Sequence, residues 1–370
     1  MTKRIRVGLL FGGRSGEHDI SIISATSVAK ALEPSKYEVV PIFITRAGAW
    51  RIGKAGDADL SAVLKHGLAV TPSVNPSGPK FILLDKPAPR SKLKVDVDVI
   101  FPVLHGTFGE DGTVQGLFEL AGIPCVGAGV LGSSAGMDKD VMKRLFRDAG
   151  LPVVPWVLVL RSEWKREPMR VRRLIEKEIG YPLFVKPSNL GSSVGISKVS
   201  RARKLAAALD LAAQYDRKIL AEMAVNAREI ECAVLGNDRP EASVPGEVVP
   251  INEFYDYEAK YLKEGSKLVI PAKLSPHQTQ RTRELAVRAF QAVDGAGMAR
   301  VDFLLDRTTG KLFVNEINTI PGFTSISMYP KLWEASGLPY PQLLDRLIEL
   351  AFERHRETTA TRYDYQPAPQ

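Results

Sequence analysis

The chain has 370 residues, of which 45% are hydrophobic and 25% charged, and at about 150 residues per domain this length predicts two or three soluble domains. No apolar run approaches the roughly 20 residues of a membrane span, and Val7–Phe11 runs into glycines rather than a signal-peptide cleavage site, so we expect a cytoplasmic protein without a membrane partner. The net charge of +8 comes from scattered Lys and Arg residues, which argues against nucleic acid as a partner.

The first part of the chain alternates between apolar strand patterns and helical patterns. The expected strands are Ile5–Phe11, Tyr37–Thr45 and Val95–Leu104. One helix is expected between Asp19 and Pro34, and another over Thr113–Leu120. Residues 46–94 are rich in loops and receive no assignment. Strand–helix alternation favours a parallel-sheet α/β domain, which we place at residues 1–137.

Two further mixed α/β units are expected after this domain. A central unit, residues 138–223, begins with Asp138 as the N-cap of a helix Lys139–Ala149. It continues with strands near Val153–Leu160, Leu183–Lys186 and Ile196–Val199, and helices near Met169–Ile179 and Arg201–Tyr215. A C-terminal unit, residues 224–358, holds a strand at Glu229–Leu235 and helices near Pro276–Val293 and Pro341–Arg354. The polar tail, residues 359–370 and the few residues before it from Glu357, is expected to be disordered.

An acidic hairpin is expected within the C-terminal unit. Residues 300–307 and 311–316 are strand-like, and the three residues between them suit a hairpin loop with Gly310 in the left-handed conformation. Counting outward from the loop places Asp302 opposite Glu316, with Cβ atoms about 4.5–5.5 Å apart, and Asn318 on the same face. Oxygen ligands of this kind suit Mg²⁺. An exposed polar face without a metal is the alternative.

A loop rich in glycine and serine, residues 187–195, follows the strand that ends at Lys186. Backbone N–H groups in such a loop can point at phosphate oxygens, because glycine permits close approach, and Lys186 can reach a phosphate. The Gly-Lys-Ser/Thr ending of a Walker loop is absent. A plain connecting loop is the alternative interpretation.

Seven stretches match one known family, and they keep their order between about residues 5 and 355. They are residues 12–18, 104–112, 137–139, 184–195, 255–261, 300–302 and 315–324. Together they resemble the D-alanine–D-alanine ligases of the ATP-grasp superfamily. The resemblance implies three α/β units with ATP between the second and third, and a two-step reaction that supplies D-alanyl-D-alanine for peptidoglycan. The carboxylate of the first D-alanine attacks the γ-phosphate of ATP, and the amine of the second displaces phosphate from the resulting D-alanyl phosphate, which splits a difficult step in two.

The resemblance also implies which residues bind the ligands. Glu17 and His105 would bind the first D-alanine, and Lys260 and Ser327 would approach the carboxylate of the second. The residues expected to bind ATP are Lys139, Lys186, Ser192, Ser193, Glu222 at the adenine, Glu229 at the ribose hydroxyls, and Lys260. Two Mg²⁺ ions, or Mn²⁺ in their place, would be held by Asp302, Glu316 and Asn318.

The catalytic roles implied by the resemblance concern charge and water. Arg300 would stabilise the transferring phosphoryl group, and the backbone N–H of Gly322 would form an oxyanion hole. Glu17, Ser192 and Tyr261 would form a hydrogen-bonded triad that closes the site, because water would hydrolyse the acyl phosphate.

Some alternatives remain open at this point. The pair Lys260-Tyr261 favours an amine acceptor, since relatives that make D-alanyl-D-lactate lack it, but D-serine is an alternative second substrate. Another ATP-grasp carboxylate–amine ligase would share the phosphate and metal ligands, and a non-catalytic nucleotide-binding regulator would be expected to lack Arg300 or the metal ligands. Met223 departs from the basic residue that relatives often carry near the adenine. A homodimer through the first unit is implied by analogy alone.

Overall fold

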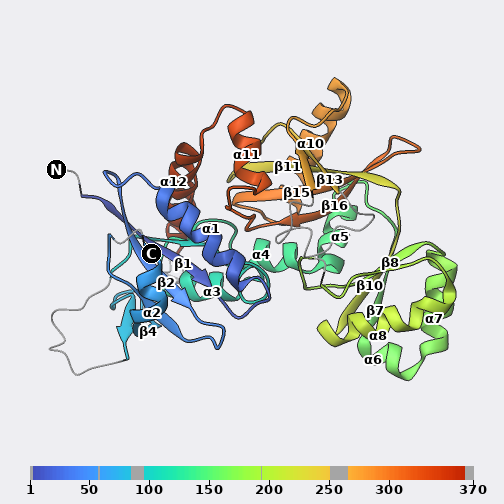
Figure 1. Ribbon diagram of the computed structural model, residues 1–370, viewed down its shortest axis with the longest axis horizontal. Helices are drawn as coiled ribbons and strands as arrows, with labels where there is room; N and C mark the ends of the chain where they lie inside the picture. The colour runs from blue at the N-terminus through green and yellow to red at the C-terminus, as the bar shows by residue number, and fades with distance from the viewer. Residues whose placement is uncertain (1–2, 57–58, 85–95, 193, 251–265, 363–370) are drawn as a thin grey trace, which may run out of the picture.

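The computed structural model describes residues 3–56, 59–84, 96–192, 194–250 and 266–362. These residues form three β-sheets with helices packed on them. In Figure 1, the N-terminal sheet lies on the left, the second sheet forms a separate lobe on the lower right, and the third lies above and between them. The predicted mixed α/β fold is therefore confirmed.

The N-terminal sheet has the strand order β5-β4-β3-β2-β1-β6. Its strands are β1 (Ile5–Gly12), β2 (Tyr37–Ile44), β3 (Trp50–Ile52), β4 (Leu68–Pro72), β5 (Phe81–Leu83) and β6 (Val99–Pro102). Its helices are α1 (His18–Ala31), α2 (Ser61–His66) and α3 (Thr113–Leu120). Strand β1 runs parallel to both β2 and β6, which confirms the predicted parallel sheet.

The described part of residues 46–94, which is 46–56 and 59–84, contains more regular secondary structure than the sequence suggested. Strands β3, β4 and β5 and helix α2 all lie in this segment, and the three strands extend the sheet in antiparallel fashion. Each strand has only three to five residues, so the apolar alternation was too brief to separate strand from loop.

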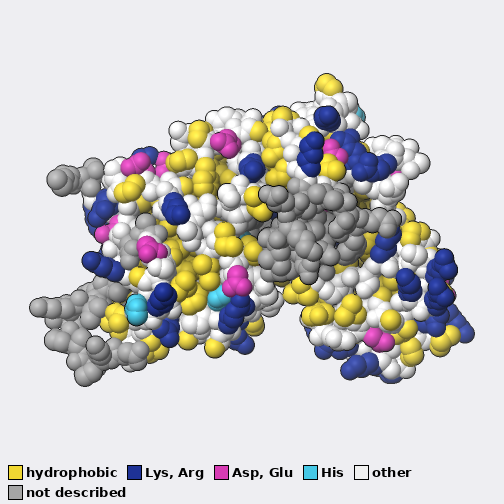
Figure 2. Space-filling model, in the orientation of Figure 1, with side chains coloured by type: hydrophobic (Ala, Val, Ile, Leu, Met, Phe, Trp, Pro, Cys, Tyr) yellow, Lys and Arg dark blue, Asp and Glu magenta, His cyan; other side chains and the backbone are white. Residues whose placement is uncertain are grey.

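The second sheet has the order β7-β10-β8-β9. Its elements are β7 (Trp156–Leu160), α6 (Arg161–Arg166), α7 (Pro168–Glu178), β8 (Leu183–Pro187), β9 (Ser197–Val199), the 3₁₀ turn η1 (Ala202–Lys204), α8 (Leu205–Tyr215) and β10 (Lys218–Met223). Helix α6 was not predicted. In Figure 2, Lys and Arg side chains gather over this lobe. On α6 and α7, Arg166, Arg170 and Lys177 are more than half exposed.

The third sheet has the order β14-β13-β11-β15-β16, and β12 pairs with β11. Its strands are β11 (Ala227–Gly236), β12 (Glu241–Ala242), β13 (Gly246–Pro250), β14 (Ser266–Val269), β15 (Gly297–Asp306) and β16 (Leu312–Asn318). The accompanying helices are α4 (Val130–Met137), α5 (Lys139–Asp148), α10 (Pro276–Ala292), α11 (Met328–Ala335) and α12 (Tyr340–Thr359). Helices α4 and α11 were not predicted, and α12 continues through Glu357, where a disordered tail was expected.

The acidic hairpin forms with one change in its loop. Asp302 pairs with Glu316, as predicted, but the loop begins one residue earlier, because the amide of Asp306 donates to the carbonyl of Lys311. A β-bulge after Asp302 adds one residue to β16 and restores the expected register. Gly310 has the predicted left-handed conformation, with φ of 68°.

The three sheets do not have three independent cores. The second sheet has its own apolar cluster, which includes Val157, Leu209 and Ile219. In contrast, α12 buries Leu344 and Leu347 in one cluster with β1, β6 and β11. Helix α5 packs Met142 and Phe146 against the third sheet, although it precedes the second sheet in the chain.

The domain boundaries at 137 and 223 stay predictions. No helix in the described part of the chain is long and apolar enough to cross a bilayer.

Candidate active site

The acidic hairpin presents an arginine between carboxylates. The Arg300 guanidinium donates from Nε and Nη2 to the two carboxylate oxygens of Asp302, both at 2.7 Å. Its Nε also lies 3.0 Å from Oε2 of Glu231 on the neighbouring strand β11. The two-point contact fixes the plane of the guanidinium, so Arg300 faces the same surface as the acids.

Asp302, Glu316 and Asn318 come from adjacent positions of β15 and β16. Asp302 pairs with Glu316 and Arg300 with Asn318 across the hairpin. The amide oxygen of Asn318 accepts a hydrogen bond from the Ile320 backbone N–H at 3.0 Å. The set therefore offers two carboxylates and one amide; over the described ranges, no group of three or more His, Cys, Asp or Glu side chains suited to a metal is found. Hard oxygen donors of this type are compatible with Mg²⁺.

Helix α5 connects this hairpin to the second sheet. The Asp138 side chain caps the helix by accepting from the Asp140 and Val141 backbone N–H groups, as predicted. The Lys139 Nζ lies 3.4 Å from Oε2 of Glu316 and donates to the Leu190 carbonyl at 3.0 Å. Lys139 thus contacts both the acidic hairpin and the Gly/Ser loop.

A second ionic cluster lies on the second sheet. Glu222 on β10 is 2% exposed, and its Oε1 accepts from Lys186 Nζ at 3.1 Å. Its Oε2 lies 3.3 Å from Nζ of Lys143, one turn beyond Lys139 on α5. Burial by itself would raise the pKa of Glu222, but the charges of Lys143 and Lys186 outweigh it and lower the pKa. Glu222 is therefore ionised at neutral pH.

The Gly/Ser loop is anchored at its start and reaches the N-terminal domain with its tip. Ser188 donates to Asp138 at 2.8 Å, and Asn189 contacts Asp216 through both backbone and side-chain N–H groups. The Ser192 hydroxyl donates to the carboxylate of Glu17. Ser192 has φ of 52°, a left-handed conformation that is uncommon for residues other than glycine, so the contact occurs at a strained position.

Glu17 lies beside two buried titratable groups. Burial lowers the pKa of His105, although the charge of Glu17 opposes this shift. Burial and the charge of Glu17 raise the pKa of Glu110 well above its ordinary value. The Gly106 amide donates to Oε2 of Glu110 at 2.7 Å. Gly106 has φ of 75°, and a Cβ atom there would lie 3.0 Å from Oε2 of Glu17. The neutral forms of His105 and Glu110 are therefore both favoured beside Glu17.

Gly322 and Ser327 lie in direct contact. A Cβ atom at Gly322 would lie only 2.7 Å from Oγ of Ser327, so any larger residue would displace the serine. The Ser327 hydroxyl accepts from the Thr324 amide at 2.9 Å. Both residues belong to the segment between β16 and α11, directly after the acidic hairpin.

The structure places the predicted site residues that it describes on several elements and loops, which include the acidic hairpin, α5, β8, β10, β11 and the Gly/Ser loop. Glu229 lies on β11, two residues before Glu231 and opposite Leu304. Ser193, Lys260 and Tyr261 lie outside the described residues, so the predicted triad is described only through its Glu17–Ser192 contact.

Three residues beside these clusters were not selected from the sequence. Lys143 follows Lys139 by four residues, which places both on one helix face. Glu231 follows Glu229 by two, which places both on one strand face. Glu110 was part of a matching stretch but received no role. The sequence spacing could have pointed to Lys143 and Glu231, whereas the burial of Glu110 was not readable from the sequence.

Comparisons with known proteins find relatives over nearly the whole chain. Family models described as the D-ala D-ala ligase N-terminus and C-terminus match residues 6–128 and 145–349. The chain belongs to the D-alanine–D-alanine ligase family. A D-alanine–D-alanine ligase of Heliobacterium modesticaldum is 51% identical over 95% of both chains, and one of Natranaerobius thermophilus is 50% identical over 98% of this chain and 99% of its own.

Solved structures of the ligase family share this fold. The D-alanine-D-alanine ligase from Coxiella burnetii superposes with a TM-score of 0.83, at 37% identity, with 97% of each chain covered. A D-Ala:D-Ser ligase from Enterococcus faecalis gives the same TM-score and identity, covering 94% of this chain and all of its own. The fold alone therefore does not distinguish the two acceptor amino acids.

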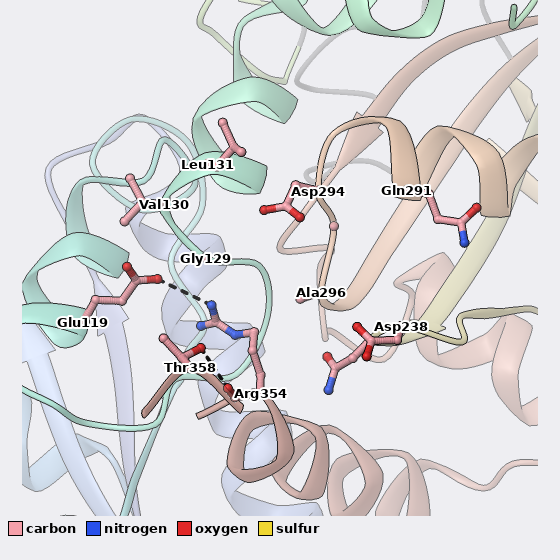
Figure 3. Close-up of a pocket in the computed structure, with 12 residues that line it drawn as sticks. Glu119, Gly129, Val130, Leu131, Asp238, Gln291, Asp294, Ala296, Arg354 and Thr358 are labelled. Atoms are coloured by element: carbon pink, nitrogen blue, oxygen red, sulfur yellow. Dashed lines mark hydrogen bonds and ion pairs between the residues drawn. The ribbon is translucent and has the colours of Figure 1, made fainter. Parts of the chain in front are cut away.

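A separate cavity of about 530 Å³ lies away from the predicted ligand residues. Figure 3 shows it bordered by Glu119, Asp238, Asp294 and Arg354, with Arg354 from α12 paired to Glu119 from α3 at 3.4 Å. None of the predicted site residues lines this cavity.

Proposed function

We propose that this chain joins two D-alanines into D-alanyl-D-alanine in the cytoplasm, with one ATP converted to ADP and phosphate. The contact between Glu17 and Ser192 carries the proposal from the structure, because it links the expected first-substrate residue to the expected phosphate loop. The relatives named D-alanine–D-alanine ligase, about 50% identical over more than nine-tenths of the chain, support D-alanine as both substrates.

The first D-alanine would be bound through its ammonium group by Glu17. Because the lowered pKa of His105 and the raised pKa of Glu110 both favour the neutral forms, Glu17 is the carboxylate that would face the ammonium. A protonated His105 would repel that ammonium, so its lowered pKa favours binding. The carboxylate of this D-alanine would then attack the γ-phosphate of ATP.

ATP would be bound between the second and third sheets. Lys139 and Lys186 would contact its phosphates, Glu222 its adenine and Glu229 its ribose hydroxyls, with Ser192 and Ser193 in the loop above. The direction of α5, with Lys139 at the acidic hairpin and Lys143 at Glu222, supports phosphates near the hairpin and the base near β10.

Asp302, Glu316 and Asn318 would hold Mg²⁺, which neutralises charge on the phosphates when it is bound. Arg300 already lies 2.7 Å from Asp302 and would face the transferring phosphoryl group. Gly322 N–H would donate to the tetrahedral oxyanion, and Ser327 and Lys260 would orient the second D-alanine. Tyr261 would complete the closure with Glu17 and Ser192, and the enzyme would act as a homodimer.

The test is phosphate release by the purified protein with MgATP and single or paired amino acids, with products identified by mass spectrometry. Phosphate release that requires D-alanine, with D-alanyl-D-alanine as the product, is expected. D-serine and D-lactate should be tested as competing acceptors at equal concentration. A preference for D-alanine–D-serine or for another carboxylate–amine pair would overturn the substrate assignment and retain the ligase chemistry.

A further inference from the structure

Lys143 is a fully buried lysine with no role in the proposed reaction. Its side chain is 1% exposed, and its Nζ lies 3.3 Å from Oε2 of Glu222. Lys186 lies 3.1 Å from the other oxygen of the same carboxylate. Two lysine side chains therefore share one carboxylate.

Stability alone does not account for this second lysine. Removing an ammonium from water costs several kcal/mol, and the attraction of a partner only offsets that cost when the pair is well arranged. Lys186 already pairs with Glu222, and burial lowers the pKa of Lys143 despite the nearby carboxylate. An apolar residue at position 143 would avoid this desolvation, so the lysine needs a functional explanation.

The two lysines differ in how firmly they are held. Lys143 projects from the interior of α5, whose first turn is fixed by the Asp138 cap, and its side chain is almost completely enclosed. Lys186 lies at the end of β8, directly before the Gly/Ser loop, and its side chain is 11% exposed. Lys186 can therefore turn toward a ligand, whereas Lys143 stays beside Glu222.

We propose that Lys143 is a positioning residue that keeps the Glu222 carboxylate charged and oriented when Lys186 turns from it to the phosphates of ATP. This inference rests on the proposed function, in which Glu222 faces the adenine. A carboxylate held in this way accepts a hydrogen bond from the 6-amino group of adenine. Guanine and hypoxanthine carry a carbonyl oxygen at that position, which has no proton to donate and is repelled by the carboxylate. Lys143 thus contributes to nucleotide selection without touching the nucleotide.

The test compares wild type with Lys143→Met in initial-rate measurements with ATP and with ITP, which carries a 6-carbonyl. In the variant, Lys186 either stays with Glu222 and does not reach the phosphates, or turns to the phosphates and leaves Glu222 unpaired. Either outcome should raise the KM for ATP about tenfold. The KM for D-alanine should stay unchanged, and the preference for ATP over ITP should fall by a similar factor. Arg144→Met is the matched control, because Arg144 is the next residue of α5 and is 56% exposed.

The variant should fold, since Lys186 still neutralises Glu222 without nucleotide. An unchanged KM for ATP together with an unchanged ATP preference overturns the proposal. An equal loss of kcat with both nucleotides, accompanied by a lower Tm, also overturns it and assigns Lys143 a structural role. Absence of D-alanyl-D-alanine synthesis by the wild type is a separate result that overturns the proposed function.

A comparison made in the Glu222→Gln background covers the case in which Lys143→Met does not fold. Glu222→Gln removes the charge that Lys143 would serve, and the combined variant leaves no unpaired carboxylate. If Lys143 acts through Glu222, adding Lys143→Met to Glu222→Gln should change the KM for ATP less than about twofold. A further change as large as about tenfold in the Glu222→Gln background overturns the proposal.

Discussion

Two ionic clusters lie one turn apart along the same face of α5, and they differ in how much water reaches them. At the second sheet, Glu222 is 2% exposed between Lys143 and Lys186. At the acidic hairpin, the Glu316 side chain is 32% exposed beside Lys139. A buried carboxylate needs permanent partners because its desolvation is costly, whereas a partly hydrated one can exchange them. We call the partly hydrated cluster at the acidic hairpin the open cluster and the buried cluster around Glu222 the closed cluster. The comparison indicates that the open cluster is arranged for reaction and the closed cluster for a fixed charge.

The sharpest way to test this difference is Arg300→Met in the open cluster. We expect kcat to fall about 1,000-fold, because a preorganised cation at a transferring phosphoryl group contributes this much. The unfolding free energy should fall less than after loss of Glu222, since Asp302 and Glu231 are 14% and 13% exposed whereas Glu222 is 2% exposed. Phosphate-release kinetics and urea unfolding measure the two quantities.

Arg300→Lys is the control, because it keeps the charge and loses the two-point contact with Asp302. It should recover part of the activity. A Met variant that loses most of its stability and only a few-fold in kcat would assign Arg300 to the fold rather than to the reaction.

The opposite result is expected from Glu222→Leu in the closed cluster. This change leaves Lys143 and Lys186 buried without their carboxylate, which should lower the unfolding free energy by about 3–5 kcal/mol. Glu349→Leu is the matched change on the surface, where Glu349 is 64% exposed beside Arg346, and should cost about 1 kcal/mol or less. Equal effects of the two changes in urea unfolding would contradict the distinction between the clusters.

A smaller effect is expected from Glu316→Gln, which preserves shape and removes one charged oxygen ligand. The Mg²⁺ concentration for half-maximal rate should rise about tenfold or more, because hard cations prefer carboxylate to amide oxygen. Glu231→Gln, on the adjacent strand and bound to Arg300, is the comparison variant. A rise in the Mg²⁺ requirement with Glu231→Gln alone would move the metal site one strand away from the predicted ligands.

The open cluster was largely predictable from the sequence. Strand alternation and a turn signal were enough to pair Asp302 with Glu316, because side chains on a strand repeat every two residues. The pairing was correct although the loop was wrong by one residue. The β-bulge that compensates for this shift depends on local backbone geometry, which the sequence pattern does not carry.

The closed cluster was only half predictable. Lys186 was predicted from its position at a strand end before the Gly/Ser loop, and Glu222 from the family resemblance. Lys143 was passed over, because a lysine in a charged helix is usually solvated. Its burial results from the docking of α5 against two sheets, a tertiary feature. The short strands β3 and β5 were missed for a related reason, since their pairing partners, rather than their own sequence, define them.

Glu110 is a buried carboxyl for which no ion pair is found among the described residues, so it offers a third case for the comparison. The pKa of Glu110 is raised first by burial and then by Glu17, so the folded protein holds a proton that the unfolded chain releases above about pH 4.3. The unfolding free energy should therefore fall as pH rises from that value toward the raised pKa. Glu110→Gln does not titrate, and its side-chain oxygen can still accept from the Gly106 amide.

Below about pH 4.3, where both side chains are neutral, the variant should lie within about 0.5 kcal/mol of wild type. As pH rises above this value, the unfolding free energy of the variant, measured in urea, should increase steadily relative to that of wild type. Glu349→Gln, an exposed change on α12, should leave the pH profile of wild type unaltered. A Glu110→Gln profile parallel to that of wild type would mean that Glu110 is charged in the folded protein. The region around Glu17 would then carry two negative charges, a poorer match for the single ammonium of D-alanine.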